Sequence, residues 1–366
     1  MEDWLPPHQR HLLFTLAHID AGIERLVRVL YDYVLLGPIE CDYRILDGRK
    51  DVLVRRISPI PEAVPRLVSD VLRLLHASID HALLAEIEHL TARALTPAEV
   101  QAVGMPVMED RATLAAWVSQ THLRTLPALQ TSGPLRTRIE SLQPFAHADQ
   151  QRHPLKVLAE YNDLSKHRMP AVAVVRLGTV VLEHRAAGLT LVGEEEDDGP
   201  LSAGDALVSV PAGMRVPMEI WPAIGIRRPC SGTWVVLMRE LRDLEVWVRT
   251  QALPILIKGT AEVDPLPPHL DISVAYADYC DAFAAAQGTP AAERQQLRPE
   301  DQDARKDLPE VFRQKLPDVP TEAVEAFVST LSDADSAAII QRYLRVRENR
   351  GERSAIGYLR RQLGLG

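Results

Sequence analysis

Two short segments of the sequence carry acidic, basic and imidazole side chains close enough together for acid–base chemistry. In the first, Leu74–His81, the residues His76 and Asp80 are spaced i,i+4 and therefore share one face of a helix. His81 follows His76 at i+5, which rotates it by about 140° around the helix axis. A straight helix cannot direct both imidazoles at one metal ion, as the H-E-x-x-H spacing does. We therefore expect no metal here, and the alternative to a functional site is a set of hydrogen-bonded packing histidines.

The second segment, residues 162–168, reads N-D-L-S-K-H-R and concentrates charge at the end of an expected helix. Asp163 and His167 are again spaced i,i+4, so the carboxylate can accept a hydrogen bond from the imidazole and fix its tautomer. Lys166 and Arg168 add positive charge on either side of His167. The alternative is simple capping, because basic residues near the C-terminal end of a helix are favoured by its dipole.

Together these residue types meet the needs of metal-independent RNA cleavage. That reaction requires a base for the ribose 2′-hydroxyl, an acid for the leaving oxygen and cations beside the phosphate. Histidines suit both proton transfers near neutral pH, so we assign these roles to His81 and His167, with Asp163 orienting His167. Lys166 and Arg168 would contact the phosphate. The prediction requires two separate helices to bring the two imidazoles to one pocket.

Hydrophobic periodicity predicts the helices that must carry these residues. Thr96, Pro97 and Glu99 also form a helix start, with a threonine cap, proline at the first position and glutamate after it. The long helix over residues 63–94 would carry the first segment. Helices are expected over residues 8–35, 63–94, 110–122, 133–142, 154–168 and 234–256, and again from Thr321 and from Ser332, with a break at Gly351.

Strand signals occur between and after these helices. Two strand-like runs flank Asp47-Gly48, a dipeptide that favours a two-residue hairpin turn. The acidic run at residues 194–199 fits a hairpin tip, because it lacks the alternating ligands of a calcium loop. Further strands, rich in β-branched residues and separated by glycines, are expected over residues 171–176, 179–182, 189–192, 206–210 and 218–226.

The fold class predicted from these elements is α+β. It comprises a helical N-terminal body with a β-hairpin, an antiparallel sheet, and a small helical C-terminal domain. A chain of 366 residues exceeds what one hydrophobic core usually holds, so more than one domain is expected. We predict an α+β domain over residues 1–263 that carries the His/Lys/Arg cluster. A linker with partial helix follows over 264–310, and the helical C-terminal domain covers 311–366.

Charge and cysteine usage narrow the function classes. The net charge of -9 argues against attraction of the whole surface to nucleic acid, although a local basic patch remains compatible with it. The cysteines at 41, 230 and 280 form no C-x-x-C pair, so neither a disulfide framework nor a cysteine zinc site is expected. No leader-like or membrane-spanning apolar run is visible, which predicts a cytoplasmic protein without membrane contact. Nucleotide-binding and hydrolase glycine motifs are missing, and we expect no cofactor.

The order of these segments resembles that of a family of uncharacterised bacterial proteins. Its members carry a leucine-arginine-serine-alanine-leucine-aspartate-histidine helix, then phenylalanine-proline-isoleucine and glutamine-proline-tyrosine stretches, then an asparagine-x-x-x-lysine-histidine-arginine motif. The corresponding segments here are Leu75–His81, Met105–Val107, Leu142–Phe145, and Asn162 with Lys166-His167-Arg168. The agreement extends over about residues 12–256, and the last motif is the most specific.

The family helix, with arginine and then histidine after four residues, is also similar to the signature of HEPN-type helical ribonucleases. This second resemblance implies a HEPN-like RNA-cleaving or RNA- and phosphate-binding protein in a toxin or phage-defence system. The chain departs from the pattern at His76, which stands where the family has arginine, while Arg73 lies one turn earlier as a further phosphate-binding candidate. His76, Asp80 and Asn162 complete the candidate site residues.

The alternative function is a non-catalytic scaffold or partner-binding protein whose histidines are structural. The C-terminal helices supply a surface for such a partner, because arginines are frequent between residues 342 and 361. A solvated helix face on a small bundle is the more frequent explanation of this pattern. The partners considered are therefore RNA, a protein bound through the basic C-terminal helices, and a second copy of the chain in a homodimer.

Overall fold

The computed structural model divides the chain into two units, residues 1–292 and 293–366, and each has a hydrophobic core of its own. We describe each unit by itself. For residues 166–167, 179–182, 191 and 218–219 the structure describes the backbone and not the side chains. The residues described are 3–91, 93–167, 173–182, 188–191, 199–214, 218–286, 290–291, 308–331, 336, 339–340, 342–343, 347, 352–363 and 365.

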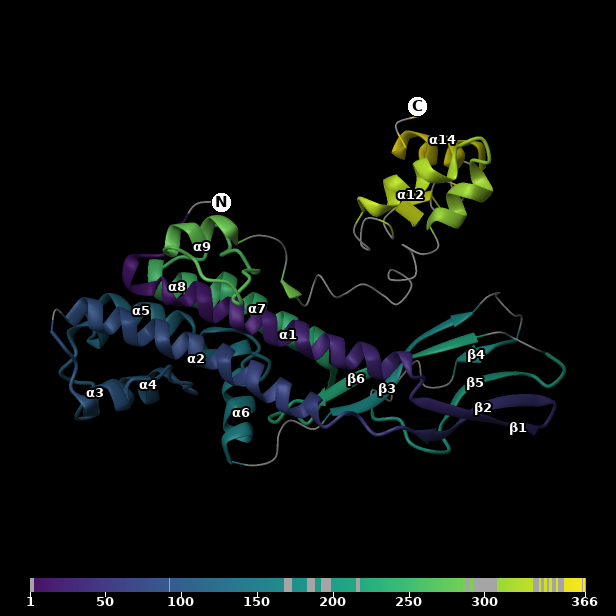
Figure 1. The fold of residues 1–366 in the computed structure, drawn as a ribbon. Helices are drawn as coiled ribbons and strands as arrows, with labels where there is room; N and C mark the ends of the chain where they lie inside the picture. Colours follow the sequence, from purple (N-terminus) through teal and green to yellow (C-terminus); the bar gives the residue numbers. More distant parts are fainter. Residues whose placement is uncertain are drawn as a thin grey trace. The chain divides into compact units, whose positions relative to one another are not determined.

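The first unit is organised around two long helices that lie side by side (Figure 1). They are α1 (His11–Leu35), preceded by the short η1 (Pro7–Gln9), and α2 (Ala63–Thr91). The two helices are antiparallel, because Gly22 of α1 lies against Val71 of α2 while the Tyr33 hydroxyl, near the end of α1, donates to the Ser58 carbonyl just before α2. A Cβ on Gly22 would lie 3.2 Å from the Val71 side chain, so glycine permits the close approach.

The predicted hairpin between these helices is confirmed. Strand β1 (Ile39–Leu46) pairs antiparallel with β2 (Arg49–Ile57). Asp47 and Gly48 have φ angles of 49° and 72°, the positive values that a type I′ turn requires at both central positions. Asp47 is the one non-glycine residue with positive φ among the described residues, which shows how strongly the turn imposes this conformation.

Short helices follow α2 and bring the chain back across the body. Thr96 caps the first of them, and the capping box with Glu99 forms as predicted. Asp110 caps the second by accepting a hydrogen bond from the Thr113 amide. These elements are α3 (Pro97–Ala102), α4 (Arg111–Val118), η2 (Pro127–Leu129), α5 (Pro134–Ser141), η3 (Pro144–Ala146) and α6 (Pro154–His167).

Two antiparallel sheets complete the α+β architecture, which confirms the predicted fold class. One sheet has the strand order β1-β2-β5-β4 and the other the order β3-β6-β7. Residues 173–182 form one bulged strand rather than two, with the register shift between Leu177 and Val180. The apolar sides of the two sheets meet around Val54 and Val208. The strands are β3 (Ala173–Leu182), β4 (Thr190–Leu191), β5 (Ala206–Pro211), β6 (Met218–Arg227) and β7 (Trp234–Val236).

The helix predicted over residues 234–256 differs from expectation at its start and in its middle. Its first residues form β7, because Val235 and Val236 pair with Ile226 and Gly225 of β6. The helical part is α7 (Leu237–Trp247), a π-helical turn η4 (Val248–Ala252) and α8 (Leu253–Lys258). Pro254 explains the π turn: its ring lacks an N–H and clashes with the carbonyl four residues earlier, so the helix widens there.

Residues after α8 still pack on the first unit. Helix α9 (Tyr279–Ala285) contributes Ala282 to a small core with Leu13 and Ala17 of α1. Asp20 of α1 accepts a hydrogen bond of 2.5 Å from the Ala291 amide. The boundary between the units at residues 292 and 293 therefore falls inside the segment predicted as a linker, because the first part of that segment is apolar enough to pack on α1.

The second unit is a small group of helices around Phe312 and Leu359. It includes α12 (Thr321–Ser329), which begins at the predicted residue, and α14 (Glu352–Gln362). The predicted helix start at Ser332 and the break at Gly351 lie outside the described residues.

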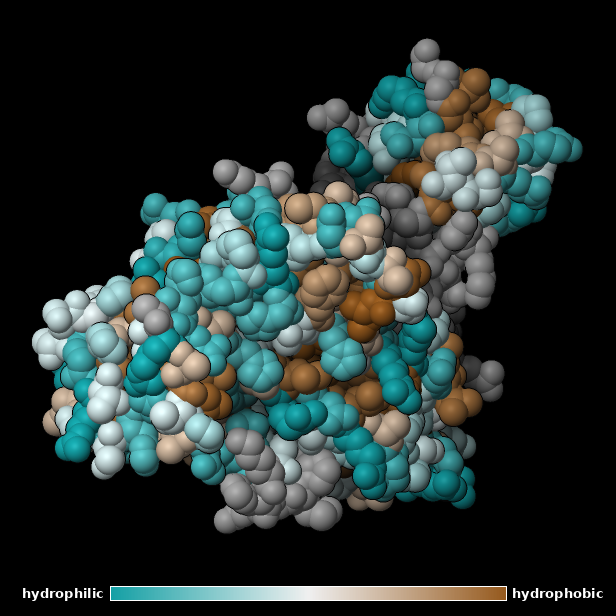
Figure 2. Space-filling view, turned by 60° about the vertical axis from the view of Figure 1, so that its left-hand side comes forward, coloured by the Kyte–Doolittle hydropathy of each residue, from teal (hydrophilic) through white to brown (hydrophobic). Residues whose placement is uncertain are grey.

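Hydrophilic residues dominate the face of the molecule in Figure 2, where hydrophobic residues form smaller groups among them. Among the described helices, none combines the length and the apolar character that crossing a bilayer would need.

Candidate functional site

His76 and Asp80, which are predicted to share one helix face, contact each other on α2, and the Asp80 carboxylate also holds a loop. The Nδ1 atom of His76 lies 3.1 Å from one carboxylate oxygen of Asp80. The other carboxylate oxygen accepts a hydrogen bond of 2.7 Å from the backbone amide of Met105. Both oxygens of Asp80 are thus engaged, one by a side chain of its own helix and one by the chain that follows α3. This arrangement positions the backbone at Met105.

Gln143 holds the same loop from the other side. Its side chain is fully buried. The amide oxygen of the side chain accepts a hydrogen bond of 2.9 Å from the Met108 amide, and its nitrogen donates one of 2.9 Å to the Pro106 carbonyl. A buried amide that both donates and accepts can satisfy neighbouring backbone groups of opposite character. Residues 105–108 are therefore held at both ends by side chains.

These contacts join three of the four segments on which the family resemblance was based. The helix segment supplies Asp80, the Met105–Val107 segment supplies the loop, and the Leu142–Phe145 segment supplies Gln143. In the fourth segment Asn162 is buried on α6. Three of these segments thus meet in one connected part of the structure, in which the side chains of Asp80 and Gln143 hold the backbone of residues 105–108.

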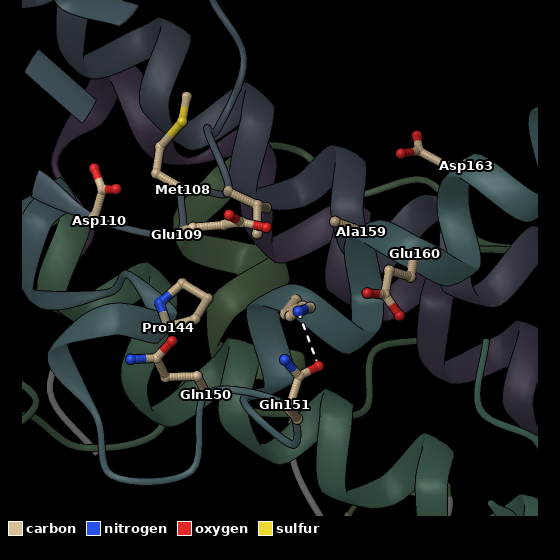
Figure 3. A pocket seen from close by; sticks show the side chains of 11 residues that line it. Met108, Glu109, Asp110, Pro144, Gln150, Gln151, Ala159, Glu160 and Asp163 are labelled. Carbon is tan, nitrogen blue, oxygen red and sulfur yellow. Dashed lines mark hydrogen bonds between the residues drawn. The ribbon is translucent and has the colours of Figure 1, made fainter. Parts of the chain in front are cut away.

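A cavity of about 620 Å³ opens beside this loop, between residues 107–110 and the outer face of α6 (Figure 3). The remaining wall comes from the segment between η3 and α6. Its lining side chains are mainly polar and acidic. They belong to Val107, Met108, Glu109, Asp110, Pro144, Gln150, Gln151, Lys156, Ala159, Glu160 and Asp163.

The charge of the cavity wall is negative. Four carboxylates line it, and the positive charge among the lining residues comes from Lys156, whose ammonium donates a hydrogen bond of 2.9 Å to the Gln151 side chain. Asp110 has a structural task as the cap of α4, and hydrogen bonds from the Thr113 hydroxyl and amide lower its pKa. The other three carboxylates belong to Glu109, Glu160 and Asp163.

Glu160 differs from the other acidic residues of the wall because one of its oxygens is buried. Among the described residues, its Oε2 atom has no hydrogen-bond partner. The neighbouring thiol of Cys230 has a raised pKa, first because it is partly buried and then because it forms a hydrogen bond with the Glu160 carboxylate, whose negative charge acts in the same direction. The thiol lies 3.6 Å from the Gln151 carbonyl. A buried carboxylate oxygen without a donor costs about 1–3 kcal/mol, which distinguishes Glu160 from the exposed carboxylates of the wall.

Two buried groups hold α6, which carries one wall of the cavity. At its N-terminal end His153 is buried, and its Nδ1 atom accepts a hydrogen bond of 3.3 Å from the Leu155 amide. Further along, the Tyr161 hydroxyl lies 3.4 Å from Glu240 of α7, whose carboxylate accepts hydrogen bonds of 2.8 and 2.6 Å from Arg228. Burial raises the pKa of the Tyr161 hydroxyl, which stays protonated and can donate to this pair.

His81 does not line the cavity. It is exposed on α2, and its ring centre lies 6.4 Å from that of His11 on α1. Burial lowers the pKa of His11, and His81 contributes to the same shift. Arg73 is also exposed on α2. The neighbour that the structure gives His81 is therefore another imidazole, whereas Asp163 of the second segment faces the cavity.

The remaining candidates lie at the end of α6. Lys166 and His167 are its last residues, and Arg168 follows the end of the helix. The side chains of Lys166 and His167, and all of Arg168, lie outside the described residues. The expected contact between Asp163 and His167, and the convergence of His81 with His167, both stay predictions.

Sequence reasoning missed most of the cavity wall. Glu109 and Glu160 belong to no recognisable motif, and Glu160 became significant only when the fold buried one of its oxygens. Asp110 offered one signal, the D-x-x-T pattern of a helix cap. Gln143 was part of a quoted motif, but sequence spacing does not indicate which backbone groups a glutamine will bind.

Comparisons of the chain with protein-family models, with curated proteins and with solved structures each return no match. Within the described part of the chain, no three His, Cys, Asp or Glu side chains are arranged to hold a metal ion. The cavity therefore has to be interpreted from its own geometry and charge.

Asp80→Ala is expected to lower the free energy of unfolding by about 1–3 kcal/mol, because the partly buried amide of Met105 loses its hydrogen-bond acceptor. Asp80→Asn keeps a side-chain oxygen and serves as the matched control with a smaller loss. Urea denaturation gives the stability, and hydrogen exchange at the Met105 amide reports the loop directly. Unchanged exchange in Asp80→Ala would contradict the role assigned to this carboxylate.

The stability of the chain should fall in mild acid through His153. Burial, and secondarily His147, lower the pKa of His153 to about 4 in the folded protein, against 6.5 for the free side chain. Between about pH 6.5 and about pH 4, His153 binds a proton in the unfolded chain but not in the folded chain. The free energy of unfolding therefore decreases as the pH falls through this interval. Above about pH 6.5 both states are neutral and the contribution is constant.

The measurement is urea denaturation of the wild type and of His153→Gln at about pH 7 and about pH 4.5. His153→Gln should lose less stability than the wild type across this interval, whatever its stability at neutral pH. His122→Gln, at an exposed histidine, is the control and should follow the wild type. Equal losses in the wild type and in His153→Gln would show that His153 does not resist protonation.

Proposed function

We propose that this chain is a non-catalytic binding protein whose cavity beside α6 accepts a positively charged group, an alkylammonium or a guanidinium. The observation that carries the proposal is the cavity wall, where the carboxylates of Glu109, Glu160 and Asp163 outnumber the one cationic side chain of the described lining, Lys156, and leave a negative opening. Amines and guanidinium groups supply both the charge and the N–H donors that such a wall requires.

The contacts of the described histidines support a binding role over a catalytic one. His76 is paired with Asp80, His8 lies 2.7 Å from Glu86 and stacks on His89, and His153 caps α6. Each of these imidazoles has a neighbour that explains its place in the packing. The alternative stated from the sequence, a partner-binding protein with structural histidines, fits these contacts.

Glu160→Gln is expected to weaken the binding of a cationic ligand at least about tenfold, because a hydrogen bond to a charged group contributes on the order of 1.5–3 kcal/mol. Asp163→Asn should have a smaller effect because this side chain is exposed and better screened. Asp70→Asn, on an exposed part of α2 away from the cavity lining, removes the same charge and is the matched control.

Isothermal titration calorimetry with spermidine and with a Gly-Arg-Arg-Gly peptide distinguishes a free amine from a basic side chain of a protein partner. Binding should also weaken with added salt, as expected for attraction between opposite charges. The proposal fails if neither probe binds, or if Glu160→Gln binds as well as Asp70→Asn does.

RNA cleavage or RNA binding at the C-terminal end of α6 is a second proposal. Its support is that α6 remains helical through His167, so Asp163 and His167 stand one turn apart as their predicted pairing requires. The carboxylates of the cavity would repel a phosphate, so RNA would have to contact Lys166 and Arg168 outside it.

The RNA proposal is tested by incubating the full chain with end-labelled RNA beside His167→Ala and Lys166→Ala. Cleavage by the wild type and its loss in His167→Ala would support catalysis. Salt-dependent RNA binding that Lys166→Ala weakens, without cleavage, would support binding alone. If the wild type neither binds nor cuts RNA, this function is excluded.

A further inference from the structure

Strand β1 is an exposed sheet edge. Among the described residues it pairs with β2 on one side and lies at the end of its sheet, and Figure 1 shows it as the outer border of the β1–β2 hairpin. Every residue from Glu40 to Leu46 is exposed. The backbone groups of an open edge strand are a template for another strand, and natural proteins usually protect such edges.

One face of β1 is apolar. From Cys41 onward the side chains alternate, so Cys41, Tyr43 and Ile45 lie on one face of the strand. Cys41 and Tyr43 stand beside Val54 and Val52 of β2, and Val54 is buried in the core between the sheets. The apolar face of β1 therefore continues the core side of the sheet past the part that the second sheet covers. Tyr43 and Ile45 on this face are 62% and 57% exposed.

The opposite face carries charges of both signs. Asp42 and Arg44 lie there, two residues apart. Arg44 makes one long contact of 3.4 Å with Asp51, whose other oxygen accepts a hydrogen bond from Ser209. The Asp42 carboxylate accepts a hydrogen bond of 2.8 Å from the Tyr43 amide, so a side chain of the same strand holds this backbone donor.

These features make β1 complementary to itself. In an antiparallel pair of two copies centred on Tyr43, Asp42 of each copy lies opposite Arg44 of the other copy. Cys41 of each copy likewise lies opposite Ile45 of the other copy. Tyr43 stands opposite Tyr43. Residues that face each other in such a pair point to the same side, so both apolar faces coincide and both charge pairs are attractive.

Neighbouring registers lack this match. Centring the pair on Asp42 places two carboxylates together, and centring it on Arg44 places two guanidinium groups together. A centre between two residues sets the apolar face of one copy against the charged face of the other, because a one-residue slip turns every side chain over. The sequence of β1 therefore selects one register of self-pairing.

We propose that β1 is a dimerisation strand, through which two copies of this chain pair antiparallel and join their β1-β2-β5-β4 sheets across a two-fold axis. On pairing, the Tyr43 amide leaves the Asp42 carboxylate and donates to the carbonyl of the second copy's Tyr43. The freed carboxylate then meets the second copy's Arg44. The same surface patch serves both copies, as a two-fold interface requires.

The oligomeric state of the full chain tests the proposal through sedimentation velocity over a range of concentrations. The wild type should form a dimer that dissociates on dilution, as expected for an interface of one strand pair. Asp42→Arg and Arg44→Asp each place like charges opposite one another and should weaken the dimer about tenfold or more. The double variant Asp42→Arg, Arg44→Asp restores opposite pairs and should dimerise again.

A cysteine cross-link tests the register. Ile45→Cys brings a thiol opposite the native Cys41 of the second copy, where the expected Cα separation of about 5.5 Å suits a disulfide. Leu46→Cys lies next to it but on the other face and is the matched control. The expected result is a disulfide-linked dimer with Ile45→Cys that disappears when Cys41 is replaced by serine.

Three outcomes would overturn the proposal. These are a chain that stays monomeric at every concentration, a dimer that the single charge reversals leave unchanged, and equal cross-linking by Ile45→Cys and Leu46→Cys. The first would mean that the Asp42 carboxylate protects the edge. Circular dichroism of each variant checks that these exposed substitutions leave the fold intact.

Discussion

The candidate site depends on the hydrogen bonds that hold the backbone of residues 105–108. A segment without regular secondary structure needs partners for its amides and carbonyls where water is excluded. Asp80 and the buried Gln143 supply them, one from α2 and one from the residue that precedes η3. Moving the segment would leave several groups unpaired at a cost of about 1–3 kcal/mol each. The cavity wall that follows, from Val107 to Asp110, is therefore held in place.

The opposite wall is fixed by a different set of buried polar groups. His153 accepts a backbone hydrogen bond at the start of α6, and Tyr161 reaches the Glu240–Arg228 pair on α7. The first contact requires a neutral imidazole, and burial ensures this at neutral pH by lowering the pKa of His153. Both walls are thus preorganised, which reduces the entropy that a ligand would have to overcome on binding.

The cavity and the β1 edge share a physical property although they use different chemistry. Each presents hydrogen-bonding groups whose needs are incompletely met within the described part of the chain. In the cavity this group is the Oε2 atom of Glu160, and at the edge it is the outer backbone of β1. In both proposals charge selects the partner: a cation for the acidic cavity, and a strand with alternating Asp42 and Arg44 for the edge.

Local patterns in the sequence determined the secondary structure around the site. The periodicity of α1 and α2, the Asp47-Gly48 turn and the Thr96 capping box all depend on residues near one another in the chain, and each is present in the structure. The failures also have local causes that outweighed periodicity. Pro254 causes a π-helical turn in the predicted helix, and Val235 and Val236 pair with β6 instead of starting that helix.

The i,i+4 spacing of His76 and Asp80 predicted that they share one helix face, and in the structure their side chains contact each other there. What the Asp80 carboxylate does with its second oxygen was decided only by the tertiary structure. Met105 lies 25 residues further along the chain, and no local rule relates the two. The same holds for Glu160, whose spacing carried no signal until packing buried one oxygen. Sequence determined which side chains share a helix face, whereas folding decided which distant backbone and cavity each face meets, because those contacts depend on how separate elements pack.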